Sequence, residues 1–129
     1  MSVTETRIVV RFCETDLMGI VHHANYLQYF EVGRVEWLKE RGFSYEKWMS
    51  AGLHLPVVEA NVRYRKAARF DDELIIETRV VETTRVTMRF GYRVRRGDVL
   101  IAEGDTLLAC VDDRMIPRRL PKEIGEALD

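Results

Sequence analysis

The sequence predicts an α+β fold in which a five-stranded antiparallel sheet wraps around one long central helix. A helical pattern of apolar residues begins near residue 25 and continues to about residue 41. From residue 54 onward, apolar and polar residues alternate with a period of two, which is typical of β-strands. One long helix cannot bury its apolar face alone, and a curved sheet folded around it buries the apolar faces of both elements.

Length and composition indicate a single globular domain that spans residues 1–129. The chain is 47% hydrophobic and 32% charged, and its net charge of −1 argues against general binding to nucleic acid or membranes. No apolar run approaches the roughly 18 residues that a membrane span needs, and residues 1–11 lack the apolar core of a signal peptide. Cys13 and Cys110 do not form a disulfide framework pattern. We therefore expect a cytoplasmic protein with reduced thiols and no membrane insertion.

The first strand is expected at residues 4–12, where Ile8, Val10 and Phe12 alternate with arginine and valine. The long helix follows, and its start is expected between residues 22 and 25. Its apolar face carries five large side chains that we expect to be buried: Tyr26, Leu27, Phe30, Trp37 and Leu38.

Local signals define the ends of the helices. Asn25 with Gln28 resembles a capping box. Gly33 costs about 1 kcal/mol relative to alanine inside a helix, so we expect another backbone to pass close to it. Gly42 predicts the end of the long helix. A short second helix is expected at residues 44–51, with Ser44 as its cap and a tryptophan packed inward.

Four strands joined by consecutive antiparallel turns are expected after the helices, at residues 55–64, 73–83, 86–95 and 99–112. Pro56 indicates an edge position for the first of these strands, because proline cannot donate to a central ladder. Gly104 suggests a β-bulge in the last strand. Pro121 starts a short C-terminal helix at residues 122–128.

The stretch from residue 16 to residue 26 carries the chemistry. Asp16 lies in a glycine turn, and two histidines and an asparagine follow before the long helix begins. A helix start offers unpaired backbone N–H groups and a partial positive charge. A carboxylate held nearby can act as a base or a nucleophile on a carbonyl whose oxygen those N–H groups bind. The alternative is that Asp16 is only a turn residue or a cap.

Three motifs stand in register along the chain. The second is residues 67–74, and the third runs from residues 110–112 through 117–118 to 120–121. The first consists of Thr15, Asp16, Gly19, Val21, His23, Ala24, Tyr26, Tyr29, Phe30, Glu31 and Arg34. Together they closely resemble the hotdog-fold acyl-CoA thioesterases, in particular the 4-hydroxybenzoyl-CoA thioesterase type and the small thioesterases encoded beside the bacterial Tol–Pal envelope genes. The resemblance covers essentially the whole chain. It implies a hotdog fold and an acyl-CoA thioesterase that acts on a small, medium or aromatic acyl-CoA.

The resemblance also implies roles for individual residues. Asp16 matches the catalytic carboxylate, and His23 matches the position whose backbone N–H polarises the thioester carbonyl. In the Tol–Pal-associated branch a histidine occupies this same position and assists catalysis. Members of the family work as homodimers or as dimers of dimers, that is homotetramers, with sites at the subunit interface. Some relatives carry a tyrosine where this chain has Phe12, so no phenol is assigned there.

Further substrate-binding residues are expected around this pair. Gly19, Val21, Asn25 and Tyr26 surround Asp16 and His23 in the sequence. The strand at residues 55–64 carries two polar residues that could line the pocket across the dimer, and arginines suit the phosphates of coenzyme A by their planar fork. These candidates are Glu59 and Asn61 for the pocket, and Arg63, Arg65 and Arg93 for the phosphates.

The remaining titratable residues suggest no cofactor. Glu31 is a rival carboxylate, for which we expect a salt bridge with Arg34 one turn later. His22 and His23 are adjacent and cannot face one site, so no metal is expected. No glycine-rich phosphate loop is present, which argues against the use of ATP or NAD. Coenzyme A enters only as part of the substrate.

Two rival functions remain on the sequence alone. One is a hotdog enoyl-CoA hydratase or dehydratase, although Asp16 and His23 stand seven positions apart, a spacing that differs from the usual motif. The other is a non-catalytic protein that binds acyl-CoA or an acyl-carrier protein. The sequence also leaves open whether Asp16 acts as nucleophile or general base.

Overall fold

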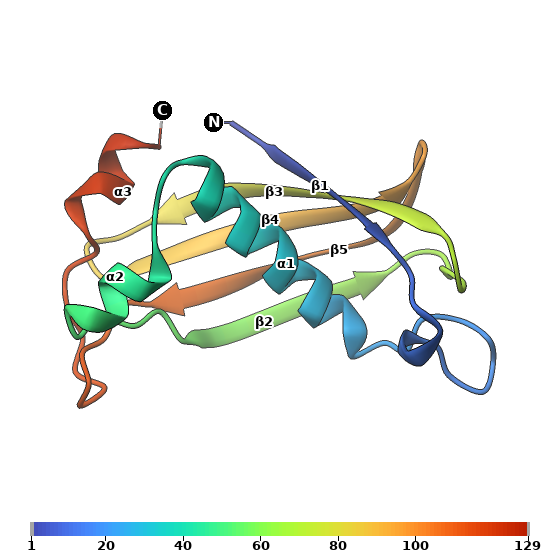
Figure 1. The fold of residues 1–129 in the computed structure, drawn as a ribbon, viewed down its shortest axis with the longest axis horizontal. Coiled ribbons are helices and arrows are strands. Elements are labelled where there is room, and N and C mark those ends of the chain that lie inside the picture. Colours follow the sequence, from blue (N-terminus) through green and yellow to red (C-terminus); the bar gives the residue numbers. More distant parts are fainter. Residues whose placement is uncertain (1, 129) are drawn as a thin grey trace.

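The computed structural model describes residues 2–128 and shows one sheet with a long helix lying across it (Figure 1). A single 3₁₀ turn, Phe12–Glu14, follows the first strand. The elements in chain order are β1 (Thr4–Val9), α1 (Asn25–Glu40), α2 (Tyr45–Ser50), β2 (Val57–Tyr64), β3 (Glu73–Thr83), β4 (Thr87–Arg96), β5 (Val99–Ala109) and α3 (Lys122–Glu126). The expected α+β architecture is confirmed.

The five strands are all antiparallel and lie in the order β1-β3-β4-β5-β2. The expected consecutive pairing holds for β3, β4 and β5 and is wrong for β2, which pairs with β5 through contacts such as Ala60 with Thr106. Burial explains the difference. The inner face of β3 is fully buried and suits the middle of the sheet, whereas β2 is mostly exposed and suits an edge, as Pro56 predicted.

The core lies between α1 and the inner face of the sheet. The Phe30 ring stacks on the Tyr92 ring at a centroid distance of 4.3 Å, and the Trp37 ring meets Phe90 edge-on at 5.4 Å. Tyr26 and Leu38 are buried as expected, but Leu27 is 43% exposed. Tyr29 is buried in its place. The buried stripe of α1 is therefore rotated slightly from the predicted one.

Two glycines mark close packing. A Cβ on Gly33 would lie against the side chains of Ile76 and Thr78 on β3, so the close neighbours are side chains and the predicted backbone contact is wrong. Gly104 forms no bulge, because it pairs regularly with Tyr92. A Cβ there would strike the carbonyl oxygen of Asn61 on β2. Gly104 therefore permits the close approach of the edge strand.

The element ends differ by a few residues from the predicted ones. β1 ends at Val9 because the chain turns into the 3₁₀ segment, where Phe12 is exposed and its ring meets the Phe70 ring edge-on. The predicted capping box is not formed, since Asn25 is the first helical residue and Ala24 occupies the cap position. The prediction for α2 is confirmed, because Ser44 Oγ accepts a hydrogen bond from the Lys47 amide.

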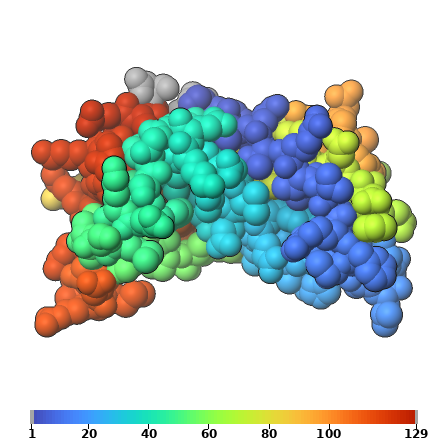
Figure 2. Space-filling model, in the orientation of Figure 1, coloured from blue at the N-terminus to red at the C-terminus, as the bar shows by residue number. Residues whose placement is uncertain are grey.

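The space-filling view shows the outline of the molecule on the α1 side (Figure 2). The loop after β5, in orange, and the segment before α1, in blue, project at opposite ends of the lower edge, which is hollowed between them. The β2 strand lies along this edge in the ribbon view (Figure 1). None of the helices within residues 2–128 is long and apolar enough to cross a membrane.

Candidate active site

The loop that carries Asp16 is a tight turn held by its own backbone. The Asp16 amide donates to the Ile20 carbonyl at 2.9 Å, and the Gly19 amide donates to the Asp16 carbonyl at 2.9 Å. Gly19 adopts a φ of +78°, which favours glycine. The side chain of Asp16 is partly buried, and its Oδ1 accepts the Met18 amide at 2.8 Å. Within residues 2–128 its Oδ2 has no hydrogen-bond partner, so that oxygen is available for chemistry.

The turn before α1 satisfies most of its own N–H groups. The amides of Asn25 and Tyr26 donate to the carbonyls of His22 and His23 at 2.9 and 3.4 Å. The Ala24 amide donates to Nδ1 of His22 at 3.1 Å. Over the described part of the chain, the His23 amide has no hydrogen-bond acceptor. It is therefore a free donor at the start of the helix, where the partial positive charge of the helix dipole strengthens its attraction for a partly negative oxygen atom.

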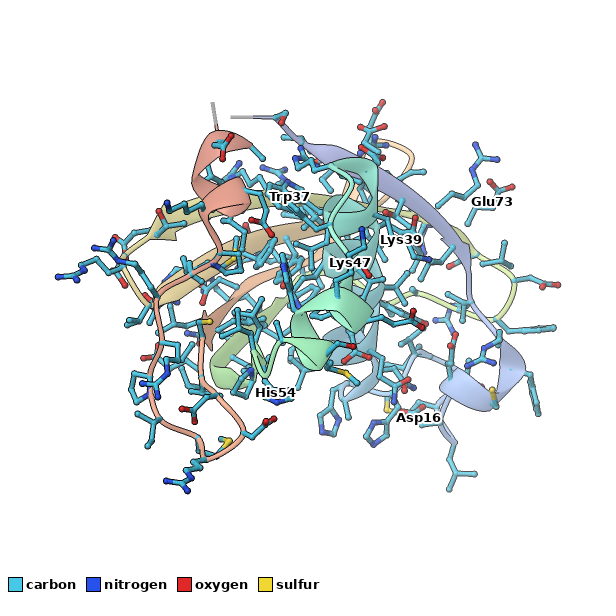
Figure 3. All side chains as sticks on the ribbon, turned by 60° about the vertical axis from the view of Figure 1, so that its left-hand side comes forward. Asp16, Trp37, Lys39, Lys47, His54 and Glu73 are labelled. Atoms are coloured by element: carbon cyan, nitrogen blue, oxygen red, sulfur yellow. The ribbon has the colours of Figure 1, made fainter. Side chains whose placement is uncertain are left out.

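Asp16 and His23 line one cleft of about 440 Å³. Asp16 lies at the end of the molecule where the α1 N-terminus meets the loop after β1 (Figure 3). The cleft is lined by Asp16, Met18, Ile20, Val21, His23, Tyr26, Tyr64, Arg65, Lys66 and Ala67. Apolar walls around a small number of polar groups are the features expected of a small-molecule site.

Two tyrosines form an aromatic wall of the cleft. The Tyr26 and Tyr64 rings meet at a centroid distance of 5.5 Å, and the Tyr64 hydroxyl donates to the His23 carbonyl at 3.1 Å. Burial raises the pKa of the Tyr26 phenol to about 12, so it stays neutral. Sequence reasoning missed Tyr64, because its contact with His23 spans 41 residues and no local pattern signals it.

Of the predicted binding residues, Val21, Tyr26 and Arg65 line this cleft. Gly19 shapes the Asp16 turn without lining the cleft. The side-chain Nδ2 of Asn25 donates to the Glu14 carbonyl at 2.8 Å, so Asn25 braces the loop. The Arg65 guanidinium also pairs with the Glu103 carboxylate at 2.9 Å.

Four other candidates lie away from the cleft of their own protomer. Arg63 and Arg93 line a separate hollow on the outer face of the sheet. Glu59 pairs with Arg89, which lines the same hollow, at 3.4 Å, and Asn61 is exposed on β2. Strand alternation explains this placement, because it turns every second side chain of β2 and β4 to the outer face. The expectations that Glu59 and Asn61 line the pocket across a dimer, and that Arg63 and Arg93 bind phosphates, stay predictions.

The rival carboxylate Glu31 is exposed, and its Oε2 lies 3.7 Å from Nη2 of Arg34, which confirms the expected salt bridge. Arg34 is buried, and its Nη1 donates to the Tyr92 hydroxyl at 3.0 Å. Because these contacts anchor the guanidinium in the core, the Glu31–Arg34 pair belongs to the packing of α1.

Sequence reasoning also missed Glu14, which is a buried carboxylate beside the Asp16 turn. Burial raises the pKa of this carboxyl, but hydrogen bonds from Arg11 and Tyr29 outweigh burial and hold the pKa below its ordinary value. The sequence signal for Glu14 is its position two residues before Asp16. Only the fold shows that Arg11 and Tyr29 converge on its carboxylate.

Residues 2–128 contain no cluster of three histidine, cysteine, aspartate or glutamate side chains arranged to hold a metal ion. Cys13 is exposed and Cys110 is buried, and both are free thiols.

The fold and the site together define a hotdog domain whose acidic loop faces the start of the central helix. The model of the Thioesterase-like superfamily matches residues 10–128, and the chain belongs to this superfamily. This membership confirms the resemblance carried by the sequence motifs.

Individual relatives agree with this assignment. The chain is 34% identical to the acyl-CoA thioesterase YbgC of Haemophilus influenzae over 92% of this chain and 88% of the relative. It superimposes on a hypothetical protein of Thermus thermophilus with a TM-score of 0.91 and 39% identity, covering 98% and 95% of the two chains. The DHNA-CoA thioesterase of Staphylococcus aureus gives a TM-score of 0.91 and 31% identity, covering 98% and 86%.

Proposed function

We propose that this protein is an acyl-CoA thioesterase that hydrolyses a small, medium or aromatic acyl-CoA to the free acid and coenzyme A. The observation that carries the proposal is that one cleft is lined by Asp16 and by His23, whose amide has no hydrogen-bond acceptor among residues 2–128. A carboxylate and an N–H donor are the two groups that acyl transfer from a thioester needs. Family membership and the named thioesterases among the relatives support the same reaction.

In this mechanism the thioester carbonyl oxygen accepts a hydrogen bond from the His23 amide. Asp16 then either attacks the carbonyl carbon or takes a proton from a water that attacks it. The tetrahedral intermediate collapses, the C–S bond breaks, and the electron pair leaves with the sulfur as a thiolate. If Asp16 attacks, the product is a mixed anhydride, which water cleaves to regenerate the carboxylate. A thiolate is a good leaving group, so the reaction needs no strong general acid.

The ring of His23 is a further candidate for proton transfer at this site. It stacks on the His22 ring at a centroid distance of 4.2 Å and faces the Tyr64 ring edge-on at 6.4 Å. Near neutral pH an imidazole exchanges protons readily. We assign it the secondary role of protonating the departing thiolate.

The shape of the cleft supports an acyl group that packs against rings. Tyr26, Tyr64 and Val21 provide apolar wall, which suits an aromatic or short aliphatic acyl group. Arg65 and Lys66 are the cations of the cleft lining and would meet the phosphates of coenzyme A or of an acyl-carrier protein prosthetic group. We propose coenzyme A as the carrier, in the cytoplasm, without any cofactor.

The unpaired edge of β2 supports a homodimer. Val57 and Val58 on this strand are 44% and 55% exposed, and an unprotected strand edge of this length is a template for pairing with another chain. Leu27 on α1 and the loop residue Leu17 are also exposed. The hollowed lower edge in Figure 2 follows β2. A second copy paired along β2 would cover these surfaces, and dimers of dimers would give the homotetramer.

The experiment that tests the function is thiol release measured with a colorimetric reagent over a panel of acyl-CoAs and acyl-carrier proteins. We expect release above the blank for at least one small, medium or aromatic acyl-CoA. Absence of release with every substrate, together with binding of acyl-CoA, would instead establish a non-catalytic binder. A change in enoyl-CoA absorbance without thiol release would establish the hydratase alternative.

A further inference from the structure

Glu14 lies beside the cleft without lining it, and its side chain is enclosed by hydrogen bonds from two elements. It is 8% exposed. Its Oε1 accepts the Arg11 amide at 2.8 Å and the Tyr29 hydroxyl at 3.0 Å, and its Oε2 accepts Nε of Arg11 at 3.1 Å. Arg11 lies in the segment that follows β1, just before the 3₁₀ turn, and Tyr29 lies in the second turn of α1. We call Glu14, Arg11 and Tyr29 the Glu14 cluster.

The backbone of Glu14 makes a second set of contacts. Its carbonyl accepts the His22 amide at 2.8 Å and Nδ2 of Asn25 at 2.8 Å. His22 belongs to the turn that immediately precedes α1, and Asn25 is the first residue of α1. One residue therefore binds the start of the Asp16 loop through its side chain and the turn before the helix through its main chain.

The distances along the chain from Glu14 to the reacting groups are short. Asp16 is two residues after Glu14, and the His22 amide bound by the Glu14 carbonyl is adjacent to the His23 peptide. Thr15 and Val21 form an antiparallel bridge between these two contacts. A shift of Glu14 therefore moves the Asp16 carboxylate and the His23 amide relative to each other.

We propose that Glu14 is a positioning residue for thioester hydrolysis, and that its hydrogen bonds to Arg11 and Tyr29 set the spacing between the Asp16 carboxylate and the His23 amide. This inference rests on the proposed function. Glu14 does not touch the substrate. Its effect falls on the transition state, because a displacement of about 1 Å in the reacting groups can reduce a rate on the order of 10²-fold.

Two variants test the proposal. Glu14→Gln keeps the shape of the side chain and removes its charge, and Tyr29→Phe keeps the ring and removes one donor. We expect kcat to fall about 10- to 100-fold in the first variant and about 2- to 10-fold in the second, with KM changed by less than about 3-fold. Glu73→Gln is the matched control, since Glu73 is an exposed, ion-paired glutamate far from Asp16 in Figure 3. It should retain the wild-type kcat.

Amide hydrogen exchange provides a readout that does not depend on activity. In folded Glu14→Gln and Tyr29→Phe we expect faster exchange of the His22 amide and of the residue 16–24 loop, with exchange in β3 to β5 unchanged. Normal exchange in this loop, a kcat within 2-fold of wild type, or an effect on KM alone would each overturn the proposal. If Glu14→Gln fails to fold, Tyr29→Phe decides the question. Wild-type protein without thiol release would refute the proposed function, while the exchange data would still decide whether Glu14 positions the loop.

Discussion

The Tyr64 hydroxyl donates a hydrogen bond to the His23 carbonyl at 3.1 Å, which joins the end of the edge strand to the turn that begins the central helix. The Tyr64 ring also forms part of the cleft wall beside Tyr26. One side chain therefore contributes both to the shape of the acyl site and to the position of the turn that carries the free amide. The two contributions can be separated by mutation.

Tyr64→Phe should reduce kcat about 2- to 10-fold, because a neutral hydrogen bond contributes on the order of 0.5–1.5 kcal/mol. Tyr64→Ala removes the ring as well and should also raise KM. Steady-state thiol release measures both parameters. A kcat for Tyr64→Phe equal to that of wild type would show that the hydroxyl does not position the turn.

Asp16→Asn should fold normally and lose roughly 10²–10⁴ in kcat, because the amide can neither attack the carbonyl nor take a proton from water. Its side-chain oxygen can still accept the Met18 amide, so the turn should persist. Thiol release on the best substrate of the panel gives the rate, and circular dichroism checks the fold. Near-normal turnover in this variant would remove Asp16 from the mechanism.

Much of the architecture was predictable because local patterns and burial agree. The alternation in β3 and β4 matches their buried inner faces, and Ser44 caps α2 as expected for a residue before a short helix. The position of β2 was not predictable from the order of the strands, because pairing with β5 depends on which strands can tolerate exposure. Gly104 shows the same dependence on strand pairing, since the atom nearest to a Cβ placed there is the backbone oxygen of Asn61, which lies on another strand far earlier in the sequence.

The candidate site was predictable where the chemistry lies in one continuous stretch. Asp16 and His23 belong to a single loop and turn, so their shared cleft follows from the motif. Tyr64 was missed because its contact with His23 spans 41 residues, and the Glu14 cluster was missed because only the fold brings Tyr29 of α1 onto a carboxylate that precedes the Asp16 turn. The face on which Arg63 lies was not predictable, because a strand turns alternate residues to opposite faces and only the register of the sheet fixes which face each residue takes.

Stability at acidic pH should depend on Glu14. Its pKa lies below the ordinary value in the folded protein, so its charged form contributes stability that is fully present above about pH 4.3, the usual pKa of a glutamate in an unfolded chain. This contribution is lost as the pH falls through the folded-state pKa. Denaturant unfolding between pH 7 and pH 3 should therefore show a steeper loss of stability for wild type than for Glu14→Gln.

Asp112 provides a comparison for this experiment, because hydrogen bonds from the amides of Ile116 and Arg114, with the Arg118 guanidinium nearby, also hold its carboxyl pKa below the ordinary value. It lies in the loop after β5, away from the Asp16 cleft. Asp112→Asn should flatten the pH dependence of stability without changing the kcat. Equal slopes for wild type and Glu14→Gln would contradict the assignment of a charged, hydrogen-bonded Glu14.

The packing of the edge strand against the core can be tested at Gly104. A methyl group at this position would strike the Asn61 carbonyl oxygen and would lie 2.9 Å from the Phe30 ring, and neither the backbone of β2 nor the buried ring can move freely. Gly104→Ala should therefore lower the free energy of unfolding by about 1–3 kcal/mol, the usual range for overpacking.

Gly125→Ala is the matched control, because nothing lies within 4 Å of a Cβ placed there and alanine favours the α3 helix. Urea unfolding should show the control as stable as wild type or slightly more stable. An unchanged midpoint for Gly104→Ala would mean that β2 does not pass so close to β5 at this position, and would also weaken the placement of Tyr64 at the end of the same strand.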